Sequence, residues 1–295
     1  MIIVGAGYAG LSAALPLAGA RRRVLLLDDG RPRNRFAHSS HGIIGHDGAD
    51  PAAIRAAALD QLSAYETVDR RAGTAIAARR SDGGFVLRLE DGQELAARRL
   101  ILATGVADRL PEMDGVRERW GVTVLHCPYC HGWEVRDRPL GVLAVSAGSA
   151  NFAALIPDWG PTTFFAQERF EPDPEQAVLL ERRGVAVERE AIEALLGDAP
   201  ELAGVRLADG RELPLAALFT PTRWSMASPL AEQLGCAIEQ APNGPYVQVD
   251  EIQETSIPGV YAAGDMTRAV HHAAFAAADG AAAGTAAHRS LAREG

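Results

Sequence analysis

The sequence contains no lysine, and this absence excludes whole classes of chemistry. All 29 basic residues are arginines, so mechanisms that need a lysine, such as Schiff-base formation or phosphate binding by a P-loop lysine, are excluded. The 38 acidic residues give a formal net charge of −9, and no arginine run exceeds three residues. Because nucleic-acid-binding surfaces are strongly basic, we expect no nucleic-acid partner.

Long apolar runs and cysteines are also scarce. No apolar run reaches the roughly 18–20 residues that a membrane span needs, and the first strand is expected to start at Met1. We therefore expect no membrane span, no secretory signal and a cytoplasmic location. The three cysteines are too few, and odd in number, for a structural disulfide framework. The 295 residues, 47% of them hydrophobic, suit one large or two medium globular domains.

A glycine-rich turn near the start of the chain indicates a dinucleotide-binding unit. The apolar residues 1–4 are followed by G-x-G-x-x-G over residues 5–10, a helical pattern to about residue 20, and a second strand over Arg23–Leu27. Such glycines let the backbone approach a pyrophosphate, which the helix N-terminus attracts. An acid after the second strand accepts hydrogen bonds from a ribose. The pattern predicts a dinucleotide site formed by Gly5, Gly7, Tyr8, Ala9, Gly10 and Asp28.

One hairpin pattern occurs twice, at an offset of 118 residues. Residues 87–95 read Leu-Arg-Leu-Glu-Asp-Gly-Gln-Glu-Leu and residues 205–213 read Val-Arg-Leu-Ala-Asp-Gly-Arg-Glu-Leu. The first copy is expected to join strands over Phe85–Leu89 and Glu94–Leu102, because Asp-Gly between apolar alternations favours a hairpin. The second copy follows another strand–turn–helix pattern at Leu140–Leu155. The repetition suggests two copies of one α/β unit.

A single C-x-x-C pair, Cys127 and Cys130, is the main chemical lead. This spacing lowers the pKa of one thiol and keeps a second sulfur within reach, which favours a redox-active disulfide. Zinc is an alternative, with His126 or His131 as further ligands, but zinc sites usually draw four ligands from two such pairs. A C-x-x-C-H string also attaches haem. We favour the redox pair, predict no metal site, and expect Cys236 to be a buried, inert thiol.

The order of these motifs carries a family resemblance. The Gly5–Gly10 turn, the Ala103–Gly105 strand end, the C-x-x-C pair and the Gly259–Asp265 segment follow one another along the chain. Together they resemble the low-molecular-weight thioredoxin reductases, which are FAD-containing flavoproteins. The resemblance implies an α/β protein with two dinucleotide-binding, Rossmann-like, three-layer ββα domains, the second inserted into the first. It assigns residues 1–108 and 243–295 to the FAD domain and residues 109–242 to the inserted NAD(P)H-domain-like domain. It also implies a homodimer.

The same resemblance assigns roles to individual residues. Cys130 would lie next to the flavin and Cys127 would exchange with substrate, while Asp265 would bind the ribityl-phosphate part of FAD. His131 follows Cys130, and with an ordinary pKa near 6.5 it is our candidate acid–base, with His271 and His272 as open alternatives. His38, His41 and His46 cluster in one glycine-rich loop, where flavin contact is favoured over a metal site. The remaining predicted FAD-binding residues are Arg35, His41, Gly45, Thr104, Gly105, Gly264, His272 and Ala273.

Two departures from the family argue against NADPH binding of the usual kind, and three sequence segments resemble a particular branch. The second turn, Ser146–Ala150, keeps only one glycine, and Glu168 stands where the family has basic residues for the 2′-phosphate of NADPH. We therefore expect weak or no use of NADPH and turnover with oxygen. The His126–Glu134 string, with Asp28–Arg35 and His41–Gly48, resembles the FAD-dependent dithiol oxidases that close disulfides in gliotoxin and holomycin.

Other functions remain open at this point. The same residues, supplied with electrons by NAD(P)H or a ferredoxin, would form a disulfide reductase acting on a thioredoxin-like protein or a small disulfide. A non-catalytic flavin-binding or electron-carrier protein belongs to another class, and the intact C-x-x-C argues against it.

Overall fold

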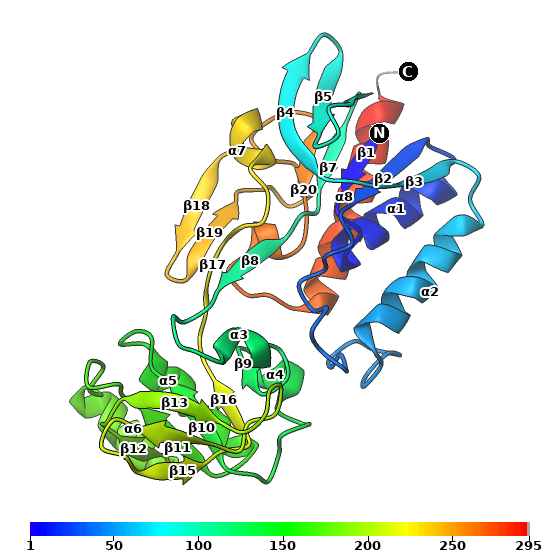
Figure 1. Cartoon of the computed structure of the whole chain (residues 1–295). Helices are drawn as coiled ribbons and strands as arrows, with labels where there is room; N and C mark the ends of the chain where they lie inside the picture. The colour runs from blue at the N-terminus through cyan, green and yellow to red at the C-terminus, as the bar shows by residue number, and fades with distance from the viewer. Residues whose placement is uncertain (294–295) are drawn as a thin grey trace. The chain divides into compact units, whose positions relative to one another are not determined.

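The computed structural model describes residues 1–293 and divides into two compact units. Unit 1 contains Met1–Arg35, Pro51–Asp108 and the chain from Trp224 onward; unit 2 contains Phe36–Asp50 and Arg109–Arg223. Each unit is built on a five-stranded parallel sheet, which the ribbon in Figure 1 allows the reader to follow. No helix within residues 1–293 is both long enough and apolar enough to cross a membrane.

The central sheet of unit 1 has the order β20-β7-β1-β2-β3, and all four pairings are parallel. Its strands are β1 (Ile2–Val4), β2 (Val24–Asp28), β3 (Val68–Ala72), β7 (Leu100–Leu102) and β20 (Val260–Ala262). Ile3, Leu26 and Ile101 project to one face, while Val4, Leu27 and Leu102 project to the other. Side chains alternate along a strand, so an apolar strand buried on both faces contributes to two separate cores.

Helices cover one face of this sheet and a small antiparallel sheet covers the other. The helices are α1 (Tyr8–Gly19), α2 (Pro51–Ser63) and α8 (Ala273–Ala292). Figure 1 shows α1, in blue, alongside α8, in red and orange. This contact is very close, because a Cβ on Gly280 would lie 2.0 Å from the carbonyl oxygen of Ala9. The small residues of α8 therefore serve close helix packing.

The antiparallel sheet of unit 1 contains β4 (Ala75–Ser81), β5 (Gly84–Leu89) and β6 (Glu94–Ala97). The predicted strand over residues 94–102 is thus two strands, because β6 pairs with β5 whereas β7 joins the central parallel sheet. The remaining elements of this region are β8 (Val106–Arg109), β17 (Arg223–Met226), α7 (Leu230–Leu234), β18 (Ile238–Ala241), β19 (Gly244–Val247) and η2 (Asp265–Thr267). β8 pairs with β17, and β18 pairs with β19.

Unit 2 repeats the same plan. Its parallel sheet has the order β12-β11-β10-β16-β9. The strands are β9 (Val124–Leu125), β10 (Leu140–Leu143), β11 (Thr162–Phe165), β12 (Ala186–Glu188) and β16 (Ala217–Phe219). The antiparallel sheet contains β13 (Ile192–Leu196), β14 (Gly204–Leu207) and β15 (Glu212–Pro214). The helices are α3 (Val116–Arg119), α4 (Pro128–His131), α5 (Ser149–Ala153), η1 (Ile156–Asp158) and α6 (Pro174–Arg182).

The registers bear out the repeat that the sequence predicts. In β5–β6, Leu87 pairs with Leu95, and in β14–β15 Val205 pairs with Leu213, which is the same pairing 118 residues later. Two Rossmann-like units of the three-layer ββα type are therefore present, as predicted.

The unit boundaries differ from the predicted domain limits at two places. The sequence-based division returns to the first domain at about residue 243, whereas the chain clusters with unit 1 from Trp224. The reason is that Leu230, Ala231 and Leu234 of α7 lie in the apolar core shared by the two sheets of unit 1. Residues 36–50, predicted to belong to the first domain, cluster with unit 2.

Candidate functional site

The first glycine turn leaves the N-terminus of α1 open to an anion. Gly7 is the N-cap residue, no side chain caps the helix, and the first turn contains no acidic residue. A Cβ on Gly7 would meet no heavy atom within 4 Å, whereas a Cβ on Gly10 would lie 1.8 Å from the carbonyl oxygen of Gly5. Gly10 thus allows the turn to close tightly, and the helix presents free N–H groups and a positive dipole end.

Asp28 links this turn to the second strand. Its carboxylate accepts hydrogen bonds from the N–H of Ala6 at 2.8 Å and the N–H of Gly30 at 3.0 Å, and it is paired with Arg55 of α2. Arg55 also donates to the carbonyl oxygen of Ala6 at 3.1 Å. The sequence pattern singled out Asp28 but missed Arg55, whose position 27 residues further along the chain carried no signal.

The other predicted cofactor residues of unit 1 fall around the ends of its strands. Thr104 and Gly105 follow β7, and the Thr104 hydroxyl lies 3.5 Å from the sulfur of Met266. Gly264 is the N-cap of η2, which begins at Asp265. In the loop after β2, Arg35 donates to the carbonyl oxygen of Pro32 at 3.0 Å. The hydroxyl of Tyr8 accepts a 3.4 Å hydrogen bond from Asn34, and Ala9 is buried against α8.

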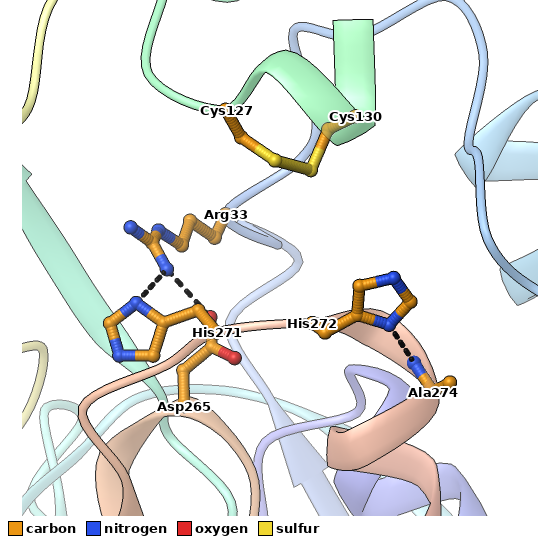
Figure 2. Close-up of a disulfide and its surroundings, with 7 residues drawn as sticks. All are labelled: Arg33, Cys127, Cys130, Asp265, His271, His272 and Ala274. Carbon is orange, nitrogen blue, oxygen red and sulfur yellow. Dashed lines mark hydrogen bonds and ion pairs between the residues drawn. A yellow bond between two sulfur atoms is a disulfide. The ribbon is translucent and has the colours of Figure 1, made fainter. Parts of the chain in front are cut away.

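Asp265 belongs to a charged cluster that sequence reasoning did not find. Arg33 donates to both oxygens of Asp108, at 2.9 and 2.5 Å, and to Asp265 at 2.8 Å, and it lies 2.7 Å from Nδ1 of His271. The Asp265 and His271 contacts are drawn in Figure 2. Burial opposes the charge of Arg33, but its bonds to Asp108 and Asp265 prevail and raise its pKa.

His272 and Ala273 mark the start of α8. His272 is the N-cap residue, and its Nδ1 accepts a hydrogen bond from the N–H of Ala274 at 3.1 Å, as Figure 2 shows. A histidine N-cap fixes the direction in which the imidazole points, because one ring nitrogen is held by the backbone.

In unit 2, Cys127 and Cys130 form a disulfide across the first turn of α4 (Figure 2). Cys127 is the N-cap residue and Pro128 occupies the first helical position, where its missing N–H costs no hydrogen bond. The Cα atoms of the two cysteines are 5.3 Å apart, a separation that an unstrained backbone permits.

Cys236 is a free, buried thiol, and burial raises its pKa, as expected for an inert cysteine.

His131 ends α4 directly after Cys130. Burial is the main effect on His131 and lowers its pKa, while the charge of Glu134 raises it and that of His41 lowers it. The ring of His126 lies 6.3 Å from that of His131, centroid to centroid. The His131 imidazole is therefore largely neutral at pH 7 and can accept a proton. The sulfurs of Cys127 and Cys130 are bonded to each other. Among the described residues, no group of three His, Cys, Asp or Glu side chains is placed to hold a metal ion.

Glu134 joins the segment after α4 to the histidine-rich loop at residues 36–50. Its Oε1 accepts from the hydroxyl of Ser39 and from Nε2 of His41, each at 2.6 Å. The hydrogen bond to Glu134 raises the pKa of His41, helped by Asp47. Burial opposes ionisation of Glu134, yet its bonds to Ser39 and His41 prevail and lower its pKa. Gly45 is exposed in the same loop, so the structure groups these two predicted flavin contacts, His41 and Gly45, with the redox pair in unit 2.

The second turn, after β10, is closed by a side chain. The hydroxyl of Ser149 accepts hydrogen bonds from the N–H groups of Val145 at 3.1 Å and Ser146 at 3.2 Å, and Ser149 is fully buried. The two N–H groups precede Gly148, the N-cap of α5, which corresponds to Gly7 of unit 1 because Phe152 donates to the carbonyl oxygen of Gly148 as Leu11 does to that of Gly7. Ser146 therefore stands where unit 1 has Gly5. After β12, the exposed Arg189 is bound to Glu171 at 2.6 Å, so its charge is already compensated.

Comparison with known proteins identifies the family. Residues 1–153 and 168–280 match the pyridine nucleotide-disulphide oxidoreductase family. The chain is 34% identical over 288 residues to thioredoxin reductase tcpT of Claviceps purpurea, an alignment that covers 93% of this chain and 89% of the relative.

Two solved structures resemble the chain over nearly its whole length. An oxidoreductase from Agrobacterium tumefaciens is 46% identical with a TM-score of 0.93, and the match covers 98% of this chain and 97% of that one. The protein HlmI is 35% identical with a TM-score of 0.91, and the match covers 99% and 92%.

The family match implies a flavin cofactor, and unit 1 fits one. The open N-terminus of α1 suits a pyrophosphate, because nothing fills the space above Gly7 and no side chain caps the helix. The match also confirms the predicted family resemblance. The chain therefore belongs to the pyridine nucleotide-disulphide oxidoreductase family, as a thioredoxin-reductase-like oxidoreductase that acts on sulfur groups.

Proposed function

We propose that this protein oxidises a small-molecule dithiol to a disulfide through Cys127 and Cys130, with FAD as cofactor and oxygen as electron acceptor. The observation that carries the proposal is the contrast within unit 2. It holds an intact disulfide at the start of α4, while the turn expected to receive a nicotinamide nucleotide keeps only one glycine and has its backbone fixed by hydrogen bonds to the hydroxyl of Ser149.

The chemistry of the cysteine pair is thiol–disulfide exchange. One substrate thiolate attacks the sulfur of Cys127, which breaks the Cys127–Cys130 bond and forms a mixed disulfide. The second substrate thiolate then attacks the substrate sulfur of that mixed disulfide, so that the substrate leaves as a disulfide. The substrate loses two electrons and two protons, and the cysteine pair gains the two electrons. FAD, when bound, would supply the two-electron chemistry that returns the cysteine pair to the disulfide, with oxygen as the final acceptor and peroxide as its product.

His131 would take up a proton in this sequence. It adjoins Cys130, and burial lowers its pKa, so its neutral imidazole is available as a base at pH 7. The thiolate is the reactive species, and a base beside the disulfide therefore raises the fraction of substrate that can attack.

We propose that unit 1 holds FAD through the residues named from the sequence. The amides at the start of α1, from Gly7 to Gly10, would bind the pyrophosphate, Asp28 the adenosine ribose and Asp265 the ribityl-phosphate part. The other proposed contacts in unit 1 are Gly5, Arg35, Thr104, Gly105, Gly264, His272 and Ala273. His41 and Gly45, which belong to unit 2, are also proposed contacts. We also propose that the active protein is a homodimer, which light scattering of the purified protein would test.

Weak NADPH binding follows from the second turn and its surroundings. Ser146 and Ala147 stand in place of glycines there, and the hydrogen bonds from Val145 and Ser146 to the hydroxyl of Ser149 fix the backbone of the turn, which opposes its adjustment to a pyrophosphate. A 2′-phosphate needs arginine partners. Only Arg169 adjoins Glu168, which adds negative charge, and Arg189 is engaged by Glu171. The loss of two charge-assisted hydrogen bonds, at about 1.5–3 kcal/mol each, weakens binding by roughly 10²–10⁴-fold.

The second candidate is a disulfide reductase that draws electrons from NAD(P)H or a ferredoxin-like protein. The name of the Claviceps relative, thioredoxin reductase tcpT, favours it. In this case electrons flow from the flavin to Cys127 and Cys130, and the substrate is a thioredoxin-like protein or a small disulfide.

The deciding experiment is an anaerobic titration of the flavin-loaded protein, followed by the visible flavin absorbance. A small dithiol such as dithiothreitol should bleach the flavin, and air should then restore the colour with formation of peroxide. Rapid bleaching by micromolar NADPH would refute the oxidase proposal in favour of the reductase. Bleaching by neither would contradict the dithiol-oxidase proposal and indicate a protein electron donor.

Two cysteine variants test whether bleaching of the flavin by a dithiol depends on Cys127 and Cys130. Cys130→Ser should abolish bleaching by the dithiol, because Cys127 alone cannot pass on two electrons. Cys236→Ala removes a thiol that lies 3.5 Å from Thr255 in the core of unit 1 and should leave bleaching unchanged. Full activity in Cys130→Ser would show that the pair is not used.

A further inference from the structure

Arg33, in the loop after β2, binds three groups of unit 1 at once. Its Nε and Nη2 donate to Asp108, which is the penultimate residue of β8, and its Nη1 donates to Asp265 at the start of η2. The same Nη1 lies 2.7 Å from Nδ1 of His271. The Arg33 side chain is 19% exposed and that of Asp108 is 7% exposed, so water competes little with these bonds.

The chemistry of the guanidinium decides where the proton of His271 lies. Arginine carries only N–H donors and no acceptor. Nδ1 of His271 must therefore present its lone pair to Arg33, which places the ring proton on Nε2. Nε2 lies 3.1 Å from the carbonyl oxygen of Arg268, which accepts that N–H. The tautomer with its proton on Nε2 therefore satisfies both ring nitrogens. In the tautomer with its proton on Nδ1, that N–H would face the N–H of Arg33, and the lone pair of Nε2 would face the carbonyl oxygen of Arg268.

The surroundings of His271 also oppose a second proton. Burial is the main effect and lowers its pKa; the charge of Asp265 and, more weakly, Asp108 raises it, and the charge of Arg33 lowers it. The ring packs edge-on against Trp224 of β17, with centroids 4.6 Å apart. In a doubly protonated ring, the N–H at Nδ1 would point at the guanidinium of Arg33, whose Nη1 lies 2.7 Å away. Two cations would then face each other with no acceptor between them.

We propose that Arg33 is a positioning residue that locks His271 in the neutral tautomer with its proton on Nε2, so that His271 is a structural link and exchanges no proton during turnover. The link ties the end of β8 and the start of η2 to the segment that leads into α8. His272, the next residue, also has Nδ1 engaged as an acceptor, from the N–H of Ala274. His131, which adjoins Cys130, is then favoured over His271 as the histidine that exchanges a proton, an assignment that rests on the proposed function, whereas the tautomer does not.

The direct test is nuclear magnetic resonance of the flavin-loaded protein with ¹⁵N-labelled histidine. Long-range ¹H–¹⁵N spectra distinguish protonated from unprotonated ring nitrogens, and His271→Asn identifies the signals of His271. We expect His271 to carry its proton on Nε2 and to titrate below the ordinary histidine pKa near 6.5, because burial and the charge of Arg33 lower its pKa. Titration near 6.5, or a proton on Nδ1, would overturn the proposal.

A pair of arginine variants tests whether Arg33 is what keeps His271 neutral. Arg33→Met removes the donor, and His271, now facing Asp265 and Asp108 without the guanidinium, should titrate at a higher pH than in the parent. Arg31→Met removes a neighbouring arginine of the same loop, one that is 67% exposed and paired with Asp29, and should change nothing. A His271 that stays neutral in Arg33→Met would show that Arg33 is not the cause.

A kinetic arm keeps the proposal testable if Arg33→Met does not fold. His271→Asn retains an acceptor oxygen close to the place of Nδ1. The pH–rate profile of dithiol oxidation in His271→Asn should keep the ionisations of the parent, although the rate falls, whereas His131→Asn should lose one of them. Loss of that ionisation in His271→Asn, with retention in His131→Asn, would overturn the proposal. Absence of any dithiol turnover would refute the proposed function and leave the spectroscopic result standing.

Discussion

The two units share one plan but differ at the turn after the first strand. In unit 1 the residue that caps α1 is Gly7, and nothing occupies the space above it. In unit 2 the turn between β10 and the cap of α5, Gly148, is two residues longer, and its backbone is fixed by the hydroxyl of Ser149, which accepts hydrogen bonds from two N–H groups. The two turns therefore differ in length and in what holds them, although the fold is the same.

The polar clusters of the two units differ in a similar way. Arg33 in unit 1 is mostly buried and holds two carboxylates and a histidine, whereas Glu134 in unit 2 is 40% exposed and holds Ser39 and His41. Buried ion pairs are costly to break, while exposed pairs contribute little. We therefore expect substitutions in unit 1 to have larger effects than their counterparts in unit 2.

The largest difference is expected between the glycines of the two turns. In Gly10→Ala the new Cβ would lie 1.8 Å from the carbonyl oxygen of Gly5, so the turn must open. We expect a loss of about 3 kcal/mol of stability and a fall in melting temperature of roughly 6–12 °C, with release of flavin. In Gly148→Ala the new Cβ would meet only the hydroxyl of Ser146, at 3.8 Å, and the change should stay within about 0.5 kcal/mol.

Thermal unfolding and the flavin content of the purified variants measure both changes. Equal destabilisation by Gly10→Ala and Gly148→Ala would break the comparison, because it would mean that the second turn is packed as tightly as the first.

An intermediate effect is expected from opening the second turn. The double variant Ser149→Gly, Glu168→Arg releases the backbone of the turn from the hydroxyl of Ser149 and replaces a negative charge with a positive one. NADPH affinity should rise at least about tenfold, or ~1.4 kcal/mol, measured by anaerobic flavin bleaching at increasing NADPH concentration. Ser146→Gly is the control, because it leaves the hydroxyl of Ser149 in place. Unchanged affinity in the double variant would show that the closed turn is not what excludes NADPH.

The smallest effect is expected at the pair of Glu134 and His41, and it depends on pH. The pKa of His41 is raised, so its stabilising contribution is complete below the ordinary histidine value near 6.5 and is lost as pH rises through its folded value. The pKa of Glu134 is lowered, so its contribution is present above the ordinary value near 4.3 and is lost as pH falls through its folded value.

The pair should therefore stabilise the fold most between about pH 4.3 and pH 6.5. Because Glu134 is substantially exposed, solvent screening keeps the effect below about 1 kcal/mol. Denaturant unfolding of Glu134→Gln against the parent should show the largest difference near pH 5.5 and a smaller one at pH 8. The exposed Glu66→Gln should show no such dependence, and a difference that grows steadily towards pH 8 would contradict this account.

The sequence by itself determined the features that depend on neighbouring residues and on strand alternation. The Gly5–Gly10 turn, the 118-residue repeat and the C-x-x-C pair were all predictable, because each is a short pattern whose geometry follows from local backbone rules. The repeat even predicted the register of Leu87 with Leu95 and of Val205 with Leu213. The departures at Ser146–Ala150 were visible as well, although the pattern showed only missing glycines and not the hydroxyl that replaces them.

Only the tertiary structure decided which distant side chains meet. Arg33 reaches partners 75, 232 and 238 residues away, and no spacing rule relates positions so far apart. The same holds for the loop at residues 36–50, which follows a strand of unit 1 but joins unit 2 through Glu134. Such contacts depend on how complete sheets and loops pack. A polar side chain in a loop has many possible partners in the unfolded chain, and only the packed fold brings one set within 3 Å.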